Sequence, residues 1–504
     1  MPKVGFMFGA GAEFCYGLPS GGDFALNIFR QDASPSKSKF RAQRDAVDLN
    51  GTYAQWLPDD LKKRNISAFG KKAYEDIIRS TVEQNREGII ARLNTLDQIS
   101  RDIVSSMKNK NIDIDADFAQ VNERTVTNSF MNRSITFIPE FEDGNDLFKS
   151  NYFSALIMSY KRMRKNHSPH APELGKIILA ILQLQVGALG EKLTHRLNEG
   201  VFKDKDEELD ILDDLGDIIQ LDYKSVGMAG LEYLLELQKP ESDTPEGRIL
   251  QFAQYLIEKI YSCVLDYKSL IDSNWMYLYH PVSEWGKFCK ISIFLLNVQK
   301  YINEIFEHLP EGRTGYYDDL NCAVGEGKLS ITTIGTSNYT PLIQNKLKTD
   351  DIIYLNGATN LWYDPYLNRI DTEAELSVFK HFIVPLMFTQ SGTKPMISID
   401  MSSRYVDFYN RLGESDEICV IGFGFNSDDE HINGIFRDLI DRKEKSVTII
   451  SRQGSRDPVS EKEVLAKRLK LQDSSRLSVI LVDDNRMRNG KSWVDCLVKS
   501  IEAR

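Results

Sequence analysis

Residues 4–13 read VGFMFGAGAE, an apolar run followed by small residues. The apolar run Val4–Phe8 is typical of a buried strand, and the glycine after it indicates a tight turn. Small residues at Gly9–Gly11 allow backbone N–H groups at the end of a first strand to approach a pyrophosphate, and the N-terminus of a following helix adds a positive dipole. The dinucleotide fingerprint G-x-G-x-x-G is incomplete, because Phe14 stands at its third glycine position. The turn alone is therefore a weak signal of nucleotide binding.

Short runs rich in β-branched residues recur towards the end of the chain, separated by segments of helical pattern. Strands alternating with helices predict parallel βαβ units, so we expect the first strand to join the later ones in one sheet. The predicted fold class is α/β, with a Rossmann-like parallel sheet. The later strands are expected at Leu329–Ile334, Ile352–Leu355, Ile418–Ile421, Val447–Ile450 and Leu477–Val482.

From about Arg41 to Gly325 the sequence is mostly helical in pattern. Thr244 and Pro245 are typical of a helix start, and apolar residues at helical spacing follow them, as expected for core packing. We therefore predict a discontinuous domain made of residues 1–40 and 325–504. Residues 41–324 would form a large, mostly helical insertion that serves regulation or protein interaction.

Small and polar residues follow several of the predicted strands. Ligands of open α/β sheets bind at the carboxyl ends of the strands, so these residues predict a single crevice for a ligand. The alternative is that they are ordinary turn residues, since Gly, Ser and Asn favour turns anyway. The residues in question are Thr336, Ser337 and Asn338, then Asn356 and Gly357, then Gly422, Phe423 and Gly424, and finally Ser451.

The order of these motifs resembles the sirtuin NAD-binding fold. G-A-G is followed by G-L-P at Gly17–Pro19, by T-S-N at Thr336–Asn338, by N-G at Asn356–Gly357 and by G-F-G at Gly422–Gly424. The chain is most similar to the sirtuin-like effectors of bacterial antiphage defence systems, which hydrolyse NAD to ADP-ribose and nicotinamide. The resemblance covers residues 1–30 and about 325–455, and it implies a sirtuin-type sheet.

The resemblance also implies roles for individual residues. Asn338 falls on the family's catalytic asparagine, and Asn356 takes the position of the family's histidine. Asp23 stands near the family's acidic residue that follows G-[IL]-P, although the spacing is three residues longer here than in deacylating sirtuins. NAD would lie against the remaining motif residues, with the first three at its phosphates. These residues are Gly9, Ala10, Gly11, Thr336, Ser337, Gly357, Gly422, Phe423, Gly424 and Ser451.

Departures from the deacylating sirtuins bear on the chemistry. The 6 cysteines include no C-x-x-C pair, so no zinc module and no metal are expected, and protein deacylation is the weakest hypothesis. Asn356 replaces the general-base histidine, and Thr340 replaces the acidic residue that often completes T-x-N-x-D. Cleavage of the nicotinamide glycosidic bond is dissociative, so positioning and electrostatic stabilisation can supply most of the acceleration. Glu13, Asp23 and Asp364 are the alternative candidate bases.

From the sequence we favour an NAD+ glycohydrolase that acts as a triggered effector and depletes NAD in antiphage defence. The alternative is a non-catalytic subunit that binds NAD or ADP-ribose and regulates a defence complex, and Asn356 is the feature that favours it. Relatives of this kind work beside companion proteins or assemble into filaments. We therefore expect a companion sensor or activator protein, a homo-oligomer, or both.

Composition sets limits on other partners. The 504 residues carry a formal net charge of -11, and an acidic surface disfavours direct binding to nucleic acid. The N-terminus lacks the pattern of a signal peptide, and the longest apolar run, around Ile177–Leu189, is interrupted by Gln183 and Gln185. We therefore expect a cytoplasmic protein with no membrane partner.

Overall fold

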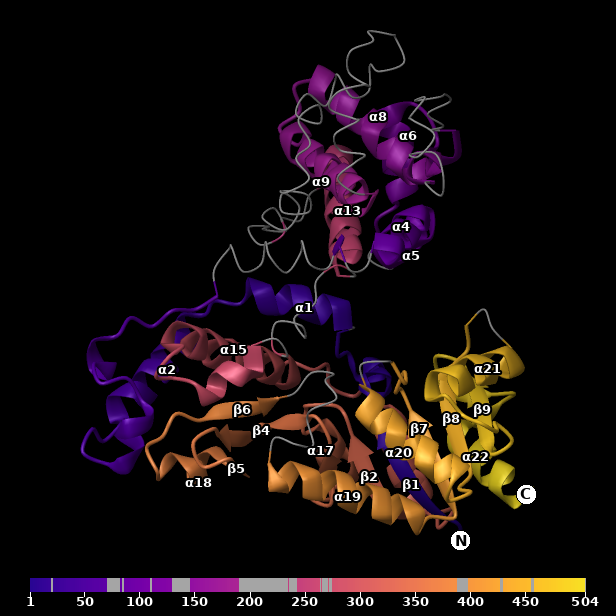
Figure 1. The fold of residues 1–504 in the computed structure, drawn as a ribbon. Coiled ribbons are helices and arrows are strands. Elements are labelled where there is room, and N and C mark those ends of the chain that lie inside the picture. Colours follow the sequence, from indigo (N-terminus) through magenta and orange to yellow (C-terminus); the bar gives the residue numbers. More distant parts are fainter. Residues whose placement is uncertain are drawn as a thin grey trace. The chain divides into compact units, whose positions relative to one another are not determined.

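The computed structural model describes residues 1–19, 21–69, 82–83, 86–108, 111–128, 146–189, 234, 243–262, 264, 271, 274–387, 398–426, 429–454 and 457–503. Contacts divide the chain into two compact units (Figure 1). Unit 1 comprises Met1–Ser20, Gln31–Phe69 and Lys268–Arg504, and unit 2 comprises Gly21–Arg30 and Gly70–Tyr267.

The main sheet of unit 1 has 6 strands, and every pairing in it is parallel. When the strands of this sheet are renumbered 1 to 6 in chain order, their order in space is 3-2-1-4-5-6. This order is compatible with a Rossmann-like fold. The prediction that the first strand joins the five later ones is confirmed. In spatial order the strands are β3 (Ile353–Tyr354), β2 (Ser330–Thr336), β1 (Lys3–Phe8), β7 (Glu417–Ile421), β8 (Val447–Arg452) and β9 (Leu477–Val482).

Helices cover both faces of this sheet. Side chains alternate between the faces along a strand, so Phe6 packs edge-on against Trp493 on one face while Gly5 faces the other. A Cβ on Gly5 would lie 2.6 Å from the side chain of Leu412 in α19 (Ile399–Gly413), so the glycine lets α19 lie close to the sheet. The helices of unit 1 are α2 (Ser34–Ala46), α15 (Trp285–Glu307), α16 (Tyr316–Gly325), α17 (Leu342–Leu347), α18 (Glu373–Ser377), α19 (Ile399–Gly413), α20 (Glu430–Asp441), α21 (Pro458–Leu469) and α22 (Trp493–Glu502).

A second, antiparallel sheet of 3 strands, which the sequence did not predict, lies in the chain between β3 and α19. Its strands, in spatial order, are β5 (Arg369–Asp371), β4 (Gly357–Asp364) and β6 (Val384–Met387). The sheet contacts α15, and α15 in turn contacts α2 (Figure 1). A buried cluster of aromatic rings holds this part together: Phe40, Trp285, Phe288 and Phe382.

The boundaries of the two units differ from the predicted boundaries at residues 40 and 325, and the aromatic cluster of Phe40, Trp285, Phe288 and Phe382 explains the difference. Residues 41–69 and 268–324 group with the parallel sheet, because α15 and α2 pack with the second sheet. Residues 21–30 group with unit 2 instead. Where the structure describes residues 41–324, it contains helices and no strand.

Unit 2 is a group of helices. The predicted start of α13 is confirmed, since the Thr244 hydroxyl accepts a hydrogen bond from the Gly247 N–H at 3.1 Å. Arg30 ties α1 to α13 through an ion pair of 2.6 Å with Glu258. The helices are α1 (Gly21–Arg30), α4 (Arg86–Asn94), α5 (Leu96–Lys108), α6 (Ile114–Asn122), α8 (Asn151–Lys165), α9 (Ala171–Leu189) and α13 (Pro245–Tyr261).

Among the described helices, α9 alone is long and apolar enough to cross a membrane, judged by length and composition. Its most apolar window is 59% buried, and it contacts α4, α8 and α13 of the same unit. Leu174, Ile177 and Ile181 are fully buried in the core of this unit. The core helix of a soluble protein meets the same criteria of length and hydropathy.

Candidate functional site

The turns after β1, β2 and β7 meet at the carboxyl edge of the parallel sheet. The Gly9 N–H donates to the Ile421 carbonyl at 2.9 Å, and the Ser337 N–H donates to the Phe8 carbonyl at 3.0 Å. Three of the predicted motifs therefore lie side by side around the end of β1. This is also the strand at which the strand order reverses, where open α/β sheets bind their ligands.

The glycines of the first motif are explained by the close approach of two turns. A Cβ on Gly9 would lie 2.5 Å from the Gly422 carbonyl oxygen, and one on Gly11 would lie 2.9 Å from the Gly422 Cα. Gly422 itself has a φ of 68°, a conformation that favours glycine. The N–H of Gly11 is also occupied, since it donates to the Gly422 carbonyl at 3.0 Å. Ala10 is exposed, and its amide has no hydrogen-bond partner in the described part of the chain.

The first strand runs into a turn, as predicted, and the following α-helix begins only at Gly21. Between them the chain makes two 3-10 turns of 3 residues each, Ala10–Ala12 and Phe14–Tyr16, and Gly17 ends the second with a φ of 104°. The next helix, α1, belongs to unit 2. Asp23 lies in that helix, and its side chain is outside the described residues.

Asn338 lies directly beyond β2 and is 5% exposed. Its Nδ2 atom donates to the Gly9 carbonyl at 3.1 Å and to the Tyr317 hydroxyl at 3.3 Å. A carbonyl can only accept, so this contact identifies the nitrogen of the amide, and both of its hydrogens are used. No hydrogen bond among the described residues uses the Oδ1 atom, which is the acceptor left for a ligand. The Thr336 hydroxyl holds the backbone, accepting from the Asn338 N–H at 3.0 Å.

A buried carboxyl group lies next to this asparagine. Glu13 is 4% exposed, and its Oε1 atom accepts from the Tyr317 hydroxyl at 3.1 Å. The Thr340 hydroxyl lies 3.0 Å from each of the two carboxyl oxygens. Burial raises the pKa of Glu13 from 4.5 to about 7, although hydrogen bonds from Thr340 and Tyr317 oppose the shift. Thr340 replaces the acidic residue of the T-x-N-x-D motif, and its hydroxyl binds the carboxyl group of Glu13, which lies in the turn after β1.

The motif after β3 adjoins the turn after β2. Asn356 is 5% exposed, and its amide nitrogen donates to the Ser337 carbonyl at 3.4 Å. Gly357 has a φ of 82°, and a Cβ on it would lie 1.9 Å from the Leu386 carbonyl oxygen. The glycine is therefore required by the start of the second sheet, which accounts for it without a ligand.

The motif after β7 and Ser451, near the end of β8, extend along the same edge. Phe423 is nearly buried and packs edge-on against Phe425, with 5.1 Å between the ring centroids. Gly424 is exposed, and its carbonyl accepts from Arg468 at 2.8 Å. Ser451 lies within β8, two strands from β1, which corresponds to roughly 10 Å at the usual strand spacing.

Asp364, the third candidate base, is not part of this edge. It ends β4 in the second sheet and is fully buried. Its Oδ1 atom accepts from the Tyr366 N–H at 2.9 Å, and its Oδ2 atom lies 2.7 Å from His381 Nδ1. These contacts close a turn and fix His381, whose ring stacks on Tyr53 with 4.0 Å between centroids. These contacts account for Asp364 and His381 without a ligand.

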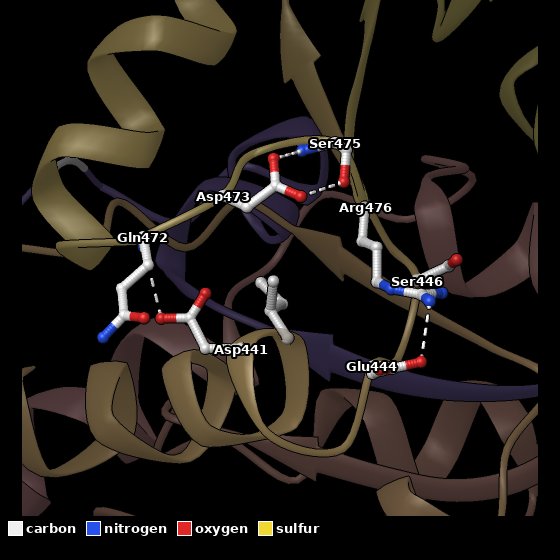
Figure 2. Close-up of a pocket in the computed structure, with 8 residues that line it drawn as sticks. Asp441, Glu444, Ser446, Gln472, Asp473, Ser475 and Arg476 are labelled. Atoms are coloured by element: carbon white, nitrogen blue, oxygen red, sulfur yellow. Dashed lines mark hydrogen bonds and ion pairs between the residues drawn. The ribbon is translucent and has the colours of Figure 1, made fainter.

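A pocket of about 560 Å³ lies at the opposite, amino edge of the sheet, where β8 and β9 begin (Figure 2). Two of its acidic side chains are paired within the pocket: Asp473 binds Ser475, and Glu444 pairs with Arg476 at 2.9 Å. Asp441 accepts from the Gln472 N–H at 3.3 Å. None of the predicted site residues lines this pocket.

Sequence reasoning missed Tyr317. This residue is fully buried in the first turn of α16, and its ring packs edge-on against Phe8 and stacks on Tyr16. It lies 304 positions from Glu13 in the sequence, so no local pattern pointed to the contact.

No group of three or more His, Cys, Asp or Glu side chains able to hold a metal ion occurs among the residues that the structure describes. No family model and no curated protein matches the chain.

Proposed function

We propose that the chain is an NAD+ glycohydrolase with a sirtuin-type, Rossmann-like domain, which converts NAD to ADP-ribose and nicotinamide. The observation that carries the proposal is the placement of Asn338. Its amide is held between the Gly9 carbonyl and the Tyr317 hydroxyl at the carboxyl end of β2, beside the strand where the order reverses. Gly9 and Asn338 belong to two of the motifs whose order resembles the sirtuin fold.

In this reaction the bond between the ribose C1′ and the nicotinamide nitrogen breaks, and a bond from C1′ to a water oxygen forms. Nicotinamide leaves as a neutral molecule, and one proton of the water is released. Asn338 Oδ1 accepts a hydrogen bond from the water or from a ribose hydroxyl and so orients it. The amide of Ala10, exposed beyond β1, is the backbone donor available to a phosphate oxygen. No metal enters this scheme.

The same proposal includes a biological role as a triggered effector that depletes NAD in antiphage defence. A constitutive NAD hydrolase would harm its own cell, so the free chain should have low activity. Unit 2 and the helices of residues 268–324 offer surface on which a companion sensor, an activator or a second copy of the chain can act. The site would work on cytoplasmic NAD.

A second candidate is a subunit that binds NAD or ADP-ribose without cleaving it. Asn356 favours this candidate, because its amide cannot take a proton at neutral pH and its nitrogen already donates to Ser337. Deacylation of proteins stays the weakest of the three hypotheses.

The purified chain incubated at high concentration with NAD for hours separates these candidates. Release of nicotinamide and ADP-ribose in equal amounts, followed by mass spectrometry, is the expected result. Binding of NAD in calorimetry without any release would replace the proposal with the second candidate. Removal of acyl groups from acylated peptides would replace it with the third.

A further inference from the structure

We infer that Glu13 and Tyr317 form a pH-dependent pair that positions the amide of Asn338. The inference deepens the proposed function, and its catalytic meaning rests on that function. The geometry is a chain of three groups in contact: Asn338 Nδ2 lies 3.3 Å from the Tyr317 hydroxyl, which lies 3.1 Å from Glu13 Oε1. All three side chains are buried, so water does not compete for these hydrogen bonds.

The direction of each hydrogen bond follows from the chemistry of the groups. An amide nitrogen can only donate, so the Tyr317 oxygen accepts from Asn338. The single hydroxyl proton of Tyr317 then points to Glu13, which accepts it as a carboxylate. In this state every proton of the chain has a partner, and the amide of Asn338 is fixed with Oδ1 directed away from Tyr317.

Protonation of Glu13 breaks this arrangement. A neutral carboxyl group carries a proton of its own, and its neighbours Tyr317 and Thr340 are both hydroxyls. If Glu13 donates from Oε1 to Tyr317, the tyrosine receives two protons from its neighbours and its own proton loses its acceptor. If Glu13 donates from Oε2 to Thr340, the hydroxyl protons of Thr340 and Tyr317 must share Oε1, and the hydrogen bond that orients Tyr317 is weakened. A buried donor without a partner is costly, so the chain rearranges and Asn338 is held less firmly.

The surrounding groups leave Glu13 as the member of this cluster that titrates near neutral pH. Burial raises the pKa values of Tyr16, Tyr317, Tyr354 and the Cys15 thiol above their usual values. The pKa of Asp318, which accepts from Tyr16 and pairs with Lys346, is lowered. None of these shifts brings a group towards neutrality. The pKa of Glu13, about 7, places its titration between pH 6 and 8.

The side-chain amide signal of Asn338 tests the inference directly. Protein labelled with ¹⁵N-asparagine is titrated from pH 5 to pH 9 by NMR, and the signal is assigned by its loss in Asn338→Ala. We expect the Asn338 signal to move with a midpoint near pH 7 in the unaltered protein. In Glu13→Gln it should stay constant over this range, and in Tyr317→Phe it should move by less than half as much.

The matched control is Glu414→Gln, which alters an exposed glutamate beyond the C-terminus of α19. It should leave the midpoint unchanged. Circular dichroism establishes that each variant is folded. An Asn338 signal that is independent of pH in the unaltered protein, or that titrates equally in Glu13→Gln, overturns the inference.

The readout separates this inference from the proposed function. If nicotinamide is released but Asn338 does not respond to Glu13, the positioning pair is refuted and the glycohydrolase stands. If Asn338 follows Glu13 but no nicotinamide is released, the pair stands and the glycohydrolase is refuted. Where both hold, the rate of NAD cleavage should fall about tenfold per pH unit below pH 7, and Glu13→Gln should remove that dependence.

Discussion

Replacing Glu13 with glutamine should change how the stability of the protein depends on pH. The substitution keeps the size of the side chain and removes its charge. Glu13 is 4% exposed, and its pKa rises from 4.5 to about 7 in the folded protein. The folded state therefore binds the proton more tightly than the unfolded state does. The stabilisation from this proton is complete below pH 4.5 and is lost as the pH rises through 7.

The magnitude follows from the two pKa values. A factor of ten in proton affinity corresponds to ~1.4 kcal/mol, so the full change amounts to about 3 kcal/mol. Most of it, roughly 2 to 3 kcal/mol, falls between pH 5 and pH 8. The glutamine variant lacks this term. Relative to the unaltered protein, its free energy of unfolding should therefore rise by that amount between the two pH values.

Guanidinium unfolding followed by circular dichroism at pH 5, 6, 7 and 8 measures this difference. The exposed Glu414→Gln serves as the control and should follow the unaltered protein at every pH. The pH-dependent part of the difference is the diagnostic quantity, because hydrogen bonds lost or gained by the glutamine contribute equally at all four values. A difference between variant and protein that is constant from pH 5 to pH 8 would refute the reasoning.

Three further predictions concern the edge of the sheet and its activity. Gly9→Ala should lower the free energy of unfolding by ~1–3 kcal/mol, because its Cβ would lie 2.5 Å from the Gly422 carbonyl oxygen. The control Gly434→Ala, with open space around it in α20, should raise the free energy of unfolding by ~0.5–1 kcal/mol. Equal effects of the two substitutions in thermal unfolding would argue against tight contact of the turns. Asn356→His should hold or raise the rate of NAD cleavage and add a pH dependence near 6.5, and a complete loss of cleavage in the folded variant would remove this position from the base assignment. The isolated chain should turn over slowly, so consumption of millimolar NAD within minutes, unaffected by any companion, would contradict a triggered effector.

The strands of the main sheet were predictable because their signals are local. An apolar run that ends in glycine marks β1, and β-branched runs mark the later strands. The sheet β5-β4-β6 was missed because Gly357 starts a strand with a positive φ, so the sequence there is typical of a turn. Its position depends on the close approach of β6, which no local pattern encodes.

The candidate site was predictable only in part, for a similar reason. Asn338 and Gly9 could be proposed from the order of motifs, and the sheet does bring them into contact. Tyr317 could not, because its role depends on contacts with residues far away in the sequence. The glycines after β1 were assigned to a phosphate, although a neighbouring turn already explains them. Asp23 stays a prediction from the order of motifs, because its side chain lies outside the described residues.

Single-turnover cleavage of NAD by Asn338→Ala tests the central claim most directly. The rate of nicotinamide release is measured with the enzyme in excess over NAD, and the Kd for NAD is measured by calorimetry on the same samples. Asn345→Ala, at an exposed position of α17, is the control and should behave as the unaltered protein. We predict that Asn338→Ala abolishes release while the Kd stays within about tenfold, because a positioning contact acts mainly in the transition state. Release by Asn338→Ala at the rate of the unaltered protein would contradict the account.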